Sequence, residues 1–359
     1  MEAAPDARTV SRWRRLLRDV LARTALLVGA LLVALLVAEL ATRALIPPAV
    51  DAFFTPFEHD DSPYAESVED PETAKTLRWY LPGREGTTGS APVHINTLGL
   101  RDEQDYAAQP PAGCFRVLVL GDSMTFGKGV AAEETWPAVL EQRLRAAHPA
   151  QCVEVLNAGM PNTNFHVQWL HFQSRWHALK PQLVLVGFFP YNDTQLEGEE
   201  EPYSLRVLEF VDRHAWLKRS ALVRWAYHRT FFDLGARKVK AGIERFFAAD
   251  YAGWKQFELS LAALVARAQE QAFRLAFALI PIPEGYTPYP FAAVHERLST
   301  TLQRQFRVPV WDTVRALDGV DARAHWIHPS DGHPDPFVHR AIGEHLARAM
   351  PWAAWLASR

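Results

Sequence analysis

A run of aliphatic residues, Val117 to Leu120, ends at Gly121 and delivers a serine into a glycine-flanked turn, in the stretch RVLVLGDSMTFG at 116–127. A strand that is apolar on both faces must be covered on both sides, as the central strands of a parallel sheet are. In open α/β sheets, ligands bind at the carboxyl ends of such strands. The stretch therefore predicts a fold class and a candidate functional residue, Ser123.

Apolar runs typical of strands alternate with helical periodicity along the rest of the chain. The predicted strands are 153–156, 183–189, 274–281 and 308–312, and the predicted helices are 133–147, 167–179, 257–271, 295–305 and a last one capped by Asp335 with Pro336 at its first position. This alternation indicates an α/β fold with a parallel sheet, right-handed crossovers and helices on both faces. The turns after the first three strands then share one edge of the sheet.

Composition excludes some classes of protein. The 359-residue chain is 48% hydrophobic, which is ample for a large buried core. A net charge of −3 and a pI near 6.5 describe no basic surface of the kind that nucleic-acid binding needs. The two cysteines make no zinc-type cluster, so we expect neither a nucleic-acid partner nor a metal or other cofactor.

The amino-terminal segment has the composition of a membrane anchor. Arginines crowd residues 8–23, and the apolar run Ala25–Ala38, extended to Ile46, gives 22 residues, close to the ~20 that span a bilayer. The basic flank predicts a cytoplasmic amino terminus, with everything after Pro47 outside. A cleaved signal peptide is the alternative, but no convincing small-residue cleavage site lies at 38–44, so an uncleaved single-pass anchor is favoured.

The predicted organisation follows from these patterns. A basic cytoplasmic segment (1–23) and a transmembrane helix (24–46) are followed by a linker rich in Pro, Asp and Glu (47–92), the main α/β body (93–350) and a carboxy-terminal tail (351–359). Residues 196–256 interrupt the strand–helix alternation with an acidic run and aromatic, Arg-rich helical segments. We interpret them as a helical insertion whose aromatic residues form its own core, or alternatively cap a substrate pocket.

Cys114 and Cys152 each come just before an apolar strand. If the two strands are neighbours, both thiols lie at the same end of the sheet, close enough for a disulfide, which an external compartment would permit. Two buried free thiols are the equal alternative.

The strand-end turns offer the groups that a reactive serine needs. A serine hydroxyl requires a base within hydrogen-bond reach and donors for the oxyanion that it creates. Gly159 can present an unhindered backbone NH, the side-chain amide of Asn192 is a second donor, and the NH of Ser123 is a third. His333, in the loop before the last helix, can serve as the base.

Four short blocks occur in order: GDSM at 121–124, NAG at 157–159, ND at 192–193 and DGHP at 331–334. With them the sequence resembles the GDSL, or SGNH, hydrolase superfamily over about residues 95–350. The resemblance implies a three-layer α/β/α, flavodoxin-like fold and an esterase. In it, Ser123 attacks an ester carbonyl, His333 takes the proton, Asp331 orients His333, and Ser123, Gly159 and Asn192 line the oxyanion hole.

Two positions depart from the common pattern of that superfamily. Met124 replaces the usual leucine, which is a tolerable apolar exchange. The aspartate stands two residues before His333 instead of three, and Ser330 occupies the usual position. In an extended segment a two-residue spacing keeps both side chains on one side, so Asp331 remains the expected orienting residue.

Other residues near the blocks receive plainer interpretations. His339 and His345 fall on the last helix as surface or packing residues, and His328 is a loop or pocket residue. A metal site in this His/Asp cluster is disfavoured because the ligand spacing is not firm. Asp122 and Asp193 are expected to fix their turns.

The leading hypothesis is a membrane-anchored serine esterase that removes acyl groups, such as acetyl, from an envelope carbohydrate or a small ester. An O-acyltransferase that passes the acyl group to a sugar hydroxyl would use the same acyl-enzyme. A catalytically silent envelope binding or assembly protein is the alternative from another class, and the intact Ser, Gly, Asn and His set argues against it.

Overall fold

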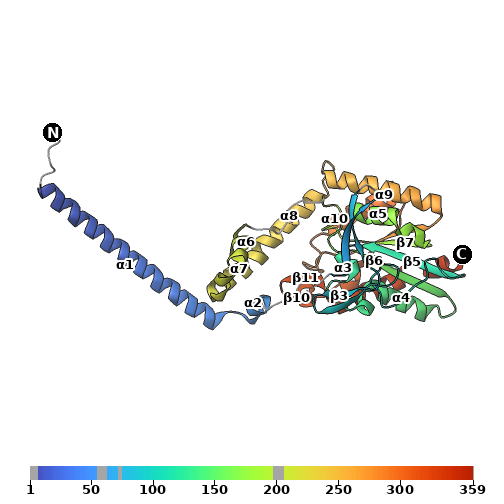
Figure 1. The fold of residues 1–359 in the computed structure, drawn as a ribbon, viewed down its shortest axis with the longest axis horizontal. Coiled ribbons are helices and arrows are strands. Elements are labelled where there is room, and N and C mark those ends of the chain that lie inside the picture. The colour runs from blue at the N-terminus through green and yellow to red at the C-terminus, as the bar shows by residue number, and fades with distance from the viewer. Residues whose placement is uncertain (1–6, 55–62, 72–74, 197–205, 359) are drawn as a thin grey trace. The chain divides into compact units, whose positions relative to one another are not determined.

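The computed structural model describes residues 7–54, 63–71, 75–196 and 206–358 (Figure 1). The described chain divides into two compact units. We call residues 7–54 and 206–234 the helical unit, and the described residues from 63 to 196 and from 235 to 358 the sheet unit. Each is described by itself.

The sheet unit is built on a parallel sheet with the strand order β6-β5-β7-β8-β9. Its strands are β5 (Cys114–Gly121), β6 (Cys152–Gly159), β7 (Leu183–Phe188), β8 (Arg274–Leu279) and β9 (Val310–Asp312). Every residue of β5 is buried, as the apolar run predicts for a central strand. In register, Gly121 of β5 lies opposite Gly159 and Gly187. The carboxyl ends of these three strands therefore meet at one edge.

Helices cover both faces of this sheet. The helices of the sheet unit are α3 (Ser123–Phe126), α4 (Trp136–Ala147), α5 (Phe165–Ser174), α8 (Ala236–Phe246), α9 (Ala252–Gln271), α10 (Ala292–Thr300), α11 (Pro336–Ala349) and α12 (Trp352–Ala357). Helix α4 packs with α11, and α5 packs with α9; in Figure 1, α5 and α9 lie on one side of the sheet and α4 on the other. The predicted fold class is confirmed. The predicted cap is also present, because the Asp335 carboxylate accepts the NH groups of Phe337 and Val338.

Antiparallel hairpins precede the central sheet, in a region where the sequence predicts a linker. They pair β1 (Ala65–Asp70) with β2 (Lys75–Tyr80), and β3 (Glu85–Thr88) with β4 (Ala91–His94). Leu77, Trp79 and Val93 are buried in the same hydrophobic core as the central strands. The boundary predicted at residue 93 is therefore too late. Polar residues outnumber the few buried positions in these short strands, so no apolar run marks them.

The insertion and the carboxy-terminal tail also differ from the predictions. The segment 196–256 is not one body, since residues 206–234 fall in the helical unit while α8 belongs to the sheet unit, and Phe246 and Phe247 are buried in its core. Residues 351–359 include α12, whose Trp352 and Leu356 are buried. The predicted tail is thus part of the core.

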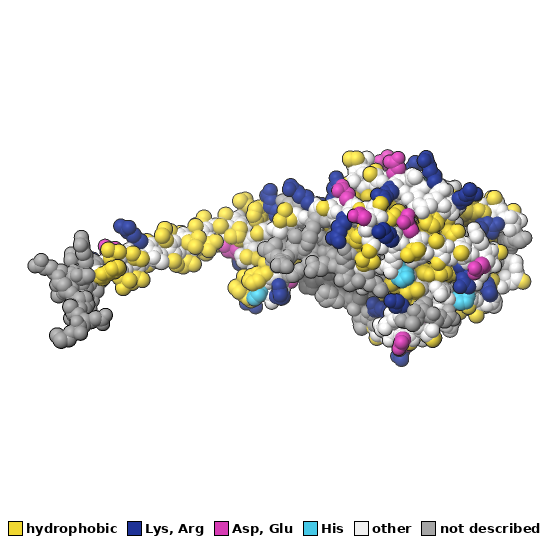
Figure 2. All heavy atoms as spheres, turned by 90° about the horizontal axis from the view of Figure 1, so that it is seen from above, with side chains coloured by type: hydrophobic (Ala, Val, Ile, Leu, Met, Phe, Trp, Pro, Cys, Tyr) yellow, Lys and Arg dark blue, Asp and Glu magenta, His cyan; other side chains and the backbone are white. Residues whose placement is uncertain are grey.

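The helical unit contains α1 (Ala7–Leu45), α2 (Pro48–Phe53), α6 (Arg206–Arg213) and α7 (Ala221–Thr230). By length and composition, α1 can cross a membrane, over the candidate span Leu16–Leu45. The apolar side chains of α1 are exposed, and Figure 2 shows them along the helix. Such a helix is typical of a membrane anchor and also of a signal sequence.

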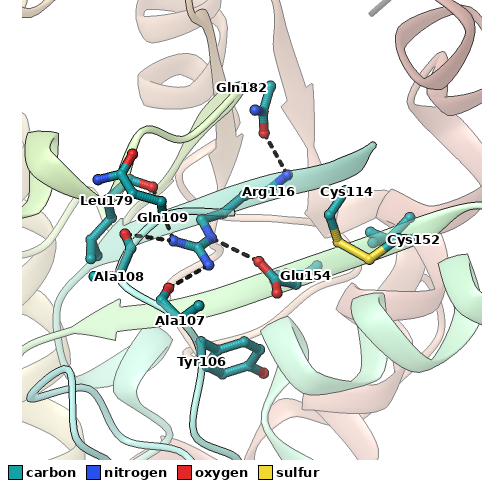
Figure 3. Close-up of polar contacts among 12 residues, drawn as sticks. Tyr106, Ala107, Ala108, Gln109, Cys114, Arg116, Cys152, Glu154, Leu179 and Gln182 are labelled. Atoms are coloured by element: carbon teal, nitrogen blue, oxygen red, sulfur yellow. Dashed lines mark hydrogen bonds and ion pairs between the residues drawn. A yellow bond between two sulfur atoms is a disulfide. The ribbon is translucent and has the colours of Figure 1, made fainter. Parts of the chain in front are cut away.

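Cys114 and Cys152 form a disulfide across the amino ends of β5 and β6 (Figure 3). They are direct partners in the parallel register, with their Cα atoms 4.4 Å apart. Of the two alternatives that the sequence leaves open, the structure has the disulfide. A cross-link here ties together the two strands that carry Ser123 and Gly159 at their other ends.

A buried charge lies beside the disulfide. The guanidinium of Arg116 is fully buried; its Nε donates to Glu154 Oε2 at 2.8 Å, and its Nη atoms donate to the carbonyl oxygens of Ala107, Ala108 and Leu179 (Figure 3). Gln182 completes the network by accepting the backbone NH of Arg116 at 2.7 Å. A buried charge is tolerated when it is paired and hydrogen-bonded in this way.

Candidate active site

Ser123 lies at the sharp turn from β5 into the short helix α3. Asp122 caps that helix, since its Oδ1 accepts the NH of Met124 at 2.9 Å. Ser123 is the first residue of α3, where a backbone NH has no partner within the helix. The serine is only 6% exposed. The turn therefore presents a nearly buried hydroxyl together with an available NH, at the carboxyl edge of the sheet.

The imidazole of His333 reaches this hydroxyl from the other end of the chain. His333 Nε2 lies 2.8 Å from Ser123 Oγ, and its Nδ1 is hydrogen-bonded to Asp331 Oδ1. The same carboxylate oxygen accepts the backbone NH of His333 at 3.1 Å. An ionised carboxylate can only accept, so Nδ1 carries the proton and Nε2 is free to accept from the serine. The structure thus brings the three predicted residues together in the expected order.

The unusual aspartate spacing is explained by the backbone around it. Asp331 and His333 lie in β11 (Asp331–Pro334), which pairs with β10 (Trp326–His328) in an antiparallel hairpin. Side chains two residues apart in a strand point to the same face. Ser330, three residues before His333, instead bonds His328, with its Oγ 2.7 Å from Nδ1. Ser330 is therefore turned to another partner.

Lys128 holds the second oxygen of the same carboxylate, a contact that the sequence did not suggest. Its Nζ lies 3.0 Å from Asp331 Oδ2, and both side chains are largely buried. Burial would raise the pKa of Asp331, but the hydrogen bonds from the side chain and backbone of His333 and the positive charge of Lys128 outweigh it and hold that pKa well below its usual range. Asp331 therefore stays ionised around neutral pH.

Asn192 follows β7 and turns its amide toward the turn that bears Ser123. Its Nδ2 donates to Asp122 Oδ2 at 2.6 Å, which leaves one amide hydrogen for another acceptor. Burial raises the pKa of Asp122 to about 6. Asp193 is also buried and accepts the NH of Phe189 and the side chain of Gln168; burial and the charge of Asp122 raise its pKa well above its usual value. Both aspartates hold turns, as predicted.

Gly159 is placed differently from the expectation. It is the last residue of β6, so the NAG block ends a strand instead of forming a turn. A side chain at this position would put a Cβ 2.2 Å from the backbone nitrogen of Phe126, so only glycine lets α3 pack this closely. The NH of Gly159 donates to Asn157 Oδ1 at 3.0 Å. The structure brings Gly159 against α3 but gives its NH a partner.

Comparison with known proteins adds to this geometry. Residues 119–341 match the profile of the GDSL-like lipase/acylhydrolase family. The chain belongs to this family. It is a hydrolase that acts on ester bonds. The comparison with curated proteins gave no significant match.

Solved structures similar to this GDSL hydrolase include a protein assigned to the G-D-S-L lipolytic family from Desulfitobacterium hafniense DCB-2, with 18% identity, a TM-score of 0.38, and coverage of 66% of this chain and 99% of that one. TesA is similar at 16% identity and a TM-score of 0.38, over 64% and 95% of the two chains. A mutant of Axe2, an acetyl-xylooligosaccharide esterase from Geobacillus, is similar at 16% identity and a TM-score of 0.41, over 66% and 95%.

The remaining histidines near the site of this GDSL hydrolase have structural partners. His325 Nδ1 pairs with Asp335 Oδ2 at 2.9 Å, beside the cap of α11. His339 is fully buried and accepts the NH of Trp136 at 3.1 Å, and burial lowers its pKa to about 3. Among the residues that the structure describes, no group of three or more His, Cys, Asp or Glu side chains could hold a metal ion.

One further backbone feature near β6 was not found from the sequence. Asn162, three residues after Gly159, has a positive φ of 61°. Asparagine tolerates this left-handed conformation better than most residues, and such conformations gather at functional turns. The NTN composition of residues 162–164 is the sequence signal that could have indicated it.

Proposed function

We propose that this GDSL hydrolase is a membrane-anchored serine esterase that removes acyl groups from an envelope carbohydrate or a small ester through an acyl-enzyme. The observation that carries the proposal is the continuous chain of contacts from Ser123 Oγ through His333 to Asp331 and Lys128. Along this series of contacts, each polar group has the partner that a nucleophile, a base or an orienting group requires.

The geometry supports a two-stage reaction. As Ser123 Oγ attacks the ester carbonyl, His333 Nε2 takes its proton, and the resulting imidazolium is stabilised by the ionised Asp331. His333 then returns the proton to the leaving alcohol, which leaves the acyl group on Ser123. Water, deprotonated by the same Nε2, attacks the acyl-enzyme, releases the free acid and regenerates the serine.

The negative charge that develops on the carbonyl oxygen needs hydrogen-bond donors fixed in advance. We expect the NH of Ser123 and the second amide hydrogen of Asn192 to be the main donors, since both remain available after the contacts given above. Gly159 can contribute only if its NH leaves Asn157 Oδ1 when substrate binds.

The proposed location rests on the amino-terminal helix and on the disulfide. With α1 across a membrane and its basic flank in the cytoplasm, the sheet unit would lie outside, in the periplasm or the extracellular space. The Cys114–Cys152 disulfide suits an oxidising compartment. Alkaline phosphatase, which is active only outside the cytoplasm, should be active when fused after residue 358. An inactive fusion would contradict the proposed topology.

A screen of purified full-length protein against short- and long-chain aryl esters and acetylated glycans tests the activity. We expect release of free acid by the natural protein and none above background by Ser123→Ala, with unchanged folding of the variant. Equal hydrolysis by the two proteins would contradict the proposal. A labelled acyl donor offered together with a sugar separates the alternatives, because an esterase releases labelled acid whereas an O-acyltransferase labels the sugar.

A further inference from the structure

The carboxyl end of α1 is hydrogen-bonded to the start of α7 within the helical unit. The carboxylate of Glu39 accepts hydrogen bonds from Ser220 Oγ at 2.6 Å and from the backbone NH groups of Ala221 and Leu222 at 3.0 and 3.1 Å. Arg43 Nε donates to the same carboxylate at 2.7 Å. These NH groups belong to the first turn of α7, where a negative charge is favourable.

The chain after α1 packs onto α7 as well. In α2, the buried Phe53 has its ring centroid 5.2 Å from that of His228 and 6.0 Å from that of Tyr227. Asp51 of α2 pairs with Arg224 of α7 at 2.9 Å. Cleavage after α1 would remove Glu39 and leave the NH groups of Ala221 and Leu222, in the first turn of α7, without this acceptor. The contacts therefore favour a retained α1 whose outer end is part of a folded unit.

The position of Glu39 along α1 sets the depth of α7. Glu39 follows Arg23 by 16 residues, which at 1.5 Å per residue is about 24 Å, close to the ~30 Å thickness of the hydrocarbon layer. If α1 spans the bilayer from its basic flank, Glu39 and Arg43 reach the external interface, where charged groups can meet water. The first turn of α7, bonded to Glu39, must then lie at the same level.

The segment before α7 is held to it and carries the residues that interfaces favour. Asp212 of α6 accepts from Lys218 at 2.6 Å and from Tyr227 of α7 at 2.9 Å. Phe210 is 53% exposed and Trp216 is 66% exposed. Tryptophan is enriched at membrane–water interfaces because its ring is apolar and its NH is polar.

The excess of basic residues in the segment 206–234 also favours a membrane surface as its partner. Residues 206–234 contain six Lys and Arg against three Asp and Glu, in a chain whose net charge is −3. A basic, aromatic segment beside a membrane helix has the composition that binds anionic lipid headgroups. Exposed apolar residues that gather in one region, as Phe210, Trp216 and Trp225 do, mark sites that bind a protein or a membrane.

We propose that α6, α7 and the turn between them, residues 206–230, form a platform that lies in the external membrane–water interface and binds anionic phospholipid. Phe210 and Trp216 insert among the headgroups, the net positive charge of the segment attracts the phosphates, and the contacts of Glu39 fix the platform to α1. The platform would bring this enzyme a second attachment to the membrane, beyond the single helix and independent of its esterase activity.

Site-directed spin labelling of the full-length protein in liposomes containing phosphatidylglycerol tests the platform. Because Cys114 and Cys152 are joined to each other, a single new cysteine is the labelled thiol. Phe210→Cys and Trp216→Cys probe the platform, Leu31→Cys probes the middle of α1, and Leu259→Cys, at a residue that is 73% exposed on α9, is the matched control in the sheet unit. Retained ester hydrolysis verifies that each labelled variant is folded.

We expect the labels at 210 and 216 to collide with oxygen more than with a water-soluble nickel chelate, at a depth of about 5–10 Å. The label at 259 should report water, and the label at 31 should report hydrocarbon. Water at 210 and 216 with hydrocarbon at 31 would overturn the platform, and water at all four positions would overturn the anchor with it. In either case the esterase assay stands independently.

A second measurement tests lipid charge and the Glu39 cap. The label at 216 should be shallower in vesicles of phosphatidylcholine alone, and equal depth in both vesicles would overturn the role of anionic lipid. Glu39→Ala should move this label toward water, whereas Glu258→Ala, at a half-buried position on α9 in the sheet unit, should not. No change with Glu39→Ala would overturn the role of the cap.

Discussion

The two ends of strand β5 both bury polar groups, but they use them differently. At the amino end, the Arg116 guanidinium is 0% exposed, and the atoms of its fork donate to Glu154 and to main-chain carbonyls. At the carboxyl end, Ser123 is 6% exposed and bonds His333, which is 23% exposed. One network is closed to solvent, while the other leaves part of the His333 imidazole exposed.

The comparison separates a structural polar network from the candidate catalytic one. Around Arg116, fixed partners satisfy the charge, so any substitution should affect the free energy of unfolding. Around Ser123, the partners of the hydroxyl and of Asn192 leave a lone pair and an amide hydrogen unused. We therefore expect changes at the carboxyl end to affect the rate and changes at the amino end to affect stability.

The largest expected effect is on catalysis. His333→Ala should lower kcat/KM by about 10⁴-fold or more. The fall caused by Asp331→Asn should be smaller than that one by a factor of about 10 to 100, because the loss of the base costs more than the loss of its orientation. Steady-state hydrolysis of an aryl ester measures both. His325→Asn is the matched control, since His325 also pairs with an aspartate but not with Ser123; a comparable loss there would break the comparison.

Arg116→Met should have the largest effect on stability. It leaves the carboxylate of Glu154 buried without its partner, which typically costs about 3–5 kcal/mol in the free energy of unfolding. Urea unfolding of the full-length protein in detergent would measure it, while kcat per folded molecule should stay unchanged. Arg143→Met removes an exposed ion pair with Glu344 and should cost no more than about 1 kcal/mol. If the two variants lost equal free energy of unfolding, the buried Arg116 network would stabilise the fold no more than an exposed ion pair.

Replacing both Cys114 and Cys152 by serine should lower the free energy of unfolding by about 2–4 kcal/mol, as expected for a cross-link that closes a loop of this length. The cysteines are 38 residues apart in sequence. Reduction of the natural protein should give the same loss, measured by the shift of the urea midpoint. A fall in kcat of the folded double variant would indicate instead that the disulfide also positions the catalytic end.

Lys128→Met should have a smaller effect at the carboxyl end, about a three- to tenfold fall in kcat, because it frees one oxygen of Asp331. A lowered carboxylate pKa contributes stability above its unfolded value, near 3.9, which is lost as pH falls through the folded value. Without Lys128 the folded pKa is less depressed, so acid unfolding should begin at higher pH. Lys128→Arg should restore both properties, and failure to do so would exclude a role for the charge.

Local patterns in the sequence predicted much of the fold and of the site. The central strands are continuous apolar runs, and Ser123, Asn192 and His333 stand in short blocks at their ends or in the last loop. The position of Asp331 followed from the two-residue period of an extended strand, which β11 has. These features need only nearby residues to be recognised.

The missed features depend on residues that meet only after folding. Lys128 reaches Asp331 because the hairpin of β10 and β11 returns to α3, and no local pattern marks that contact. The engagement of Gly159 NH by Asn157 depends on the side-chain rotamer of Asn157. Ser220 and Glu39 are separated by 181 positions in the chain, so the cap on α7 was equally hidden.

The most direct test of the central claim, that Ser123 is the nucleophile, is a covalent one. Full-length protein is treated with a serine-directed fluorophosphonate, digested and analysed by mass spectrometry. The geometry predicts one adduct, on Ser123, which forms much more slowly in His333→Ala and at the natural rate in His325→Asn. Absence of the adduct from a preparation that hydrolyses esters, or an adduct on a different serine, would contradict the claim.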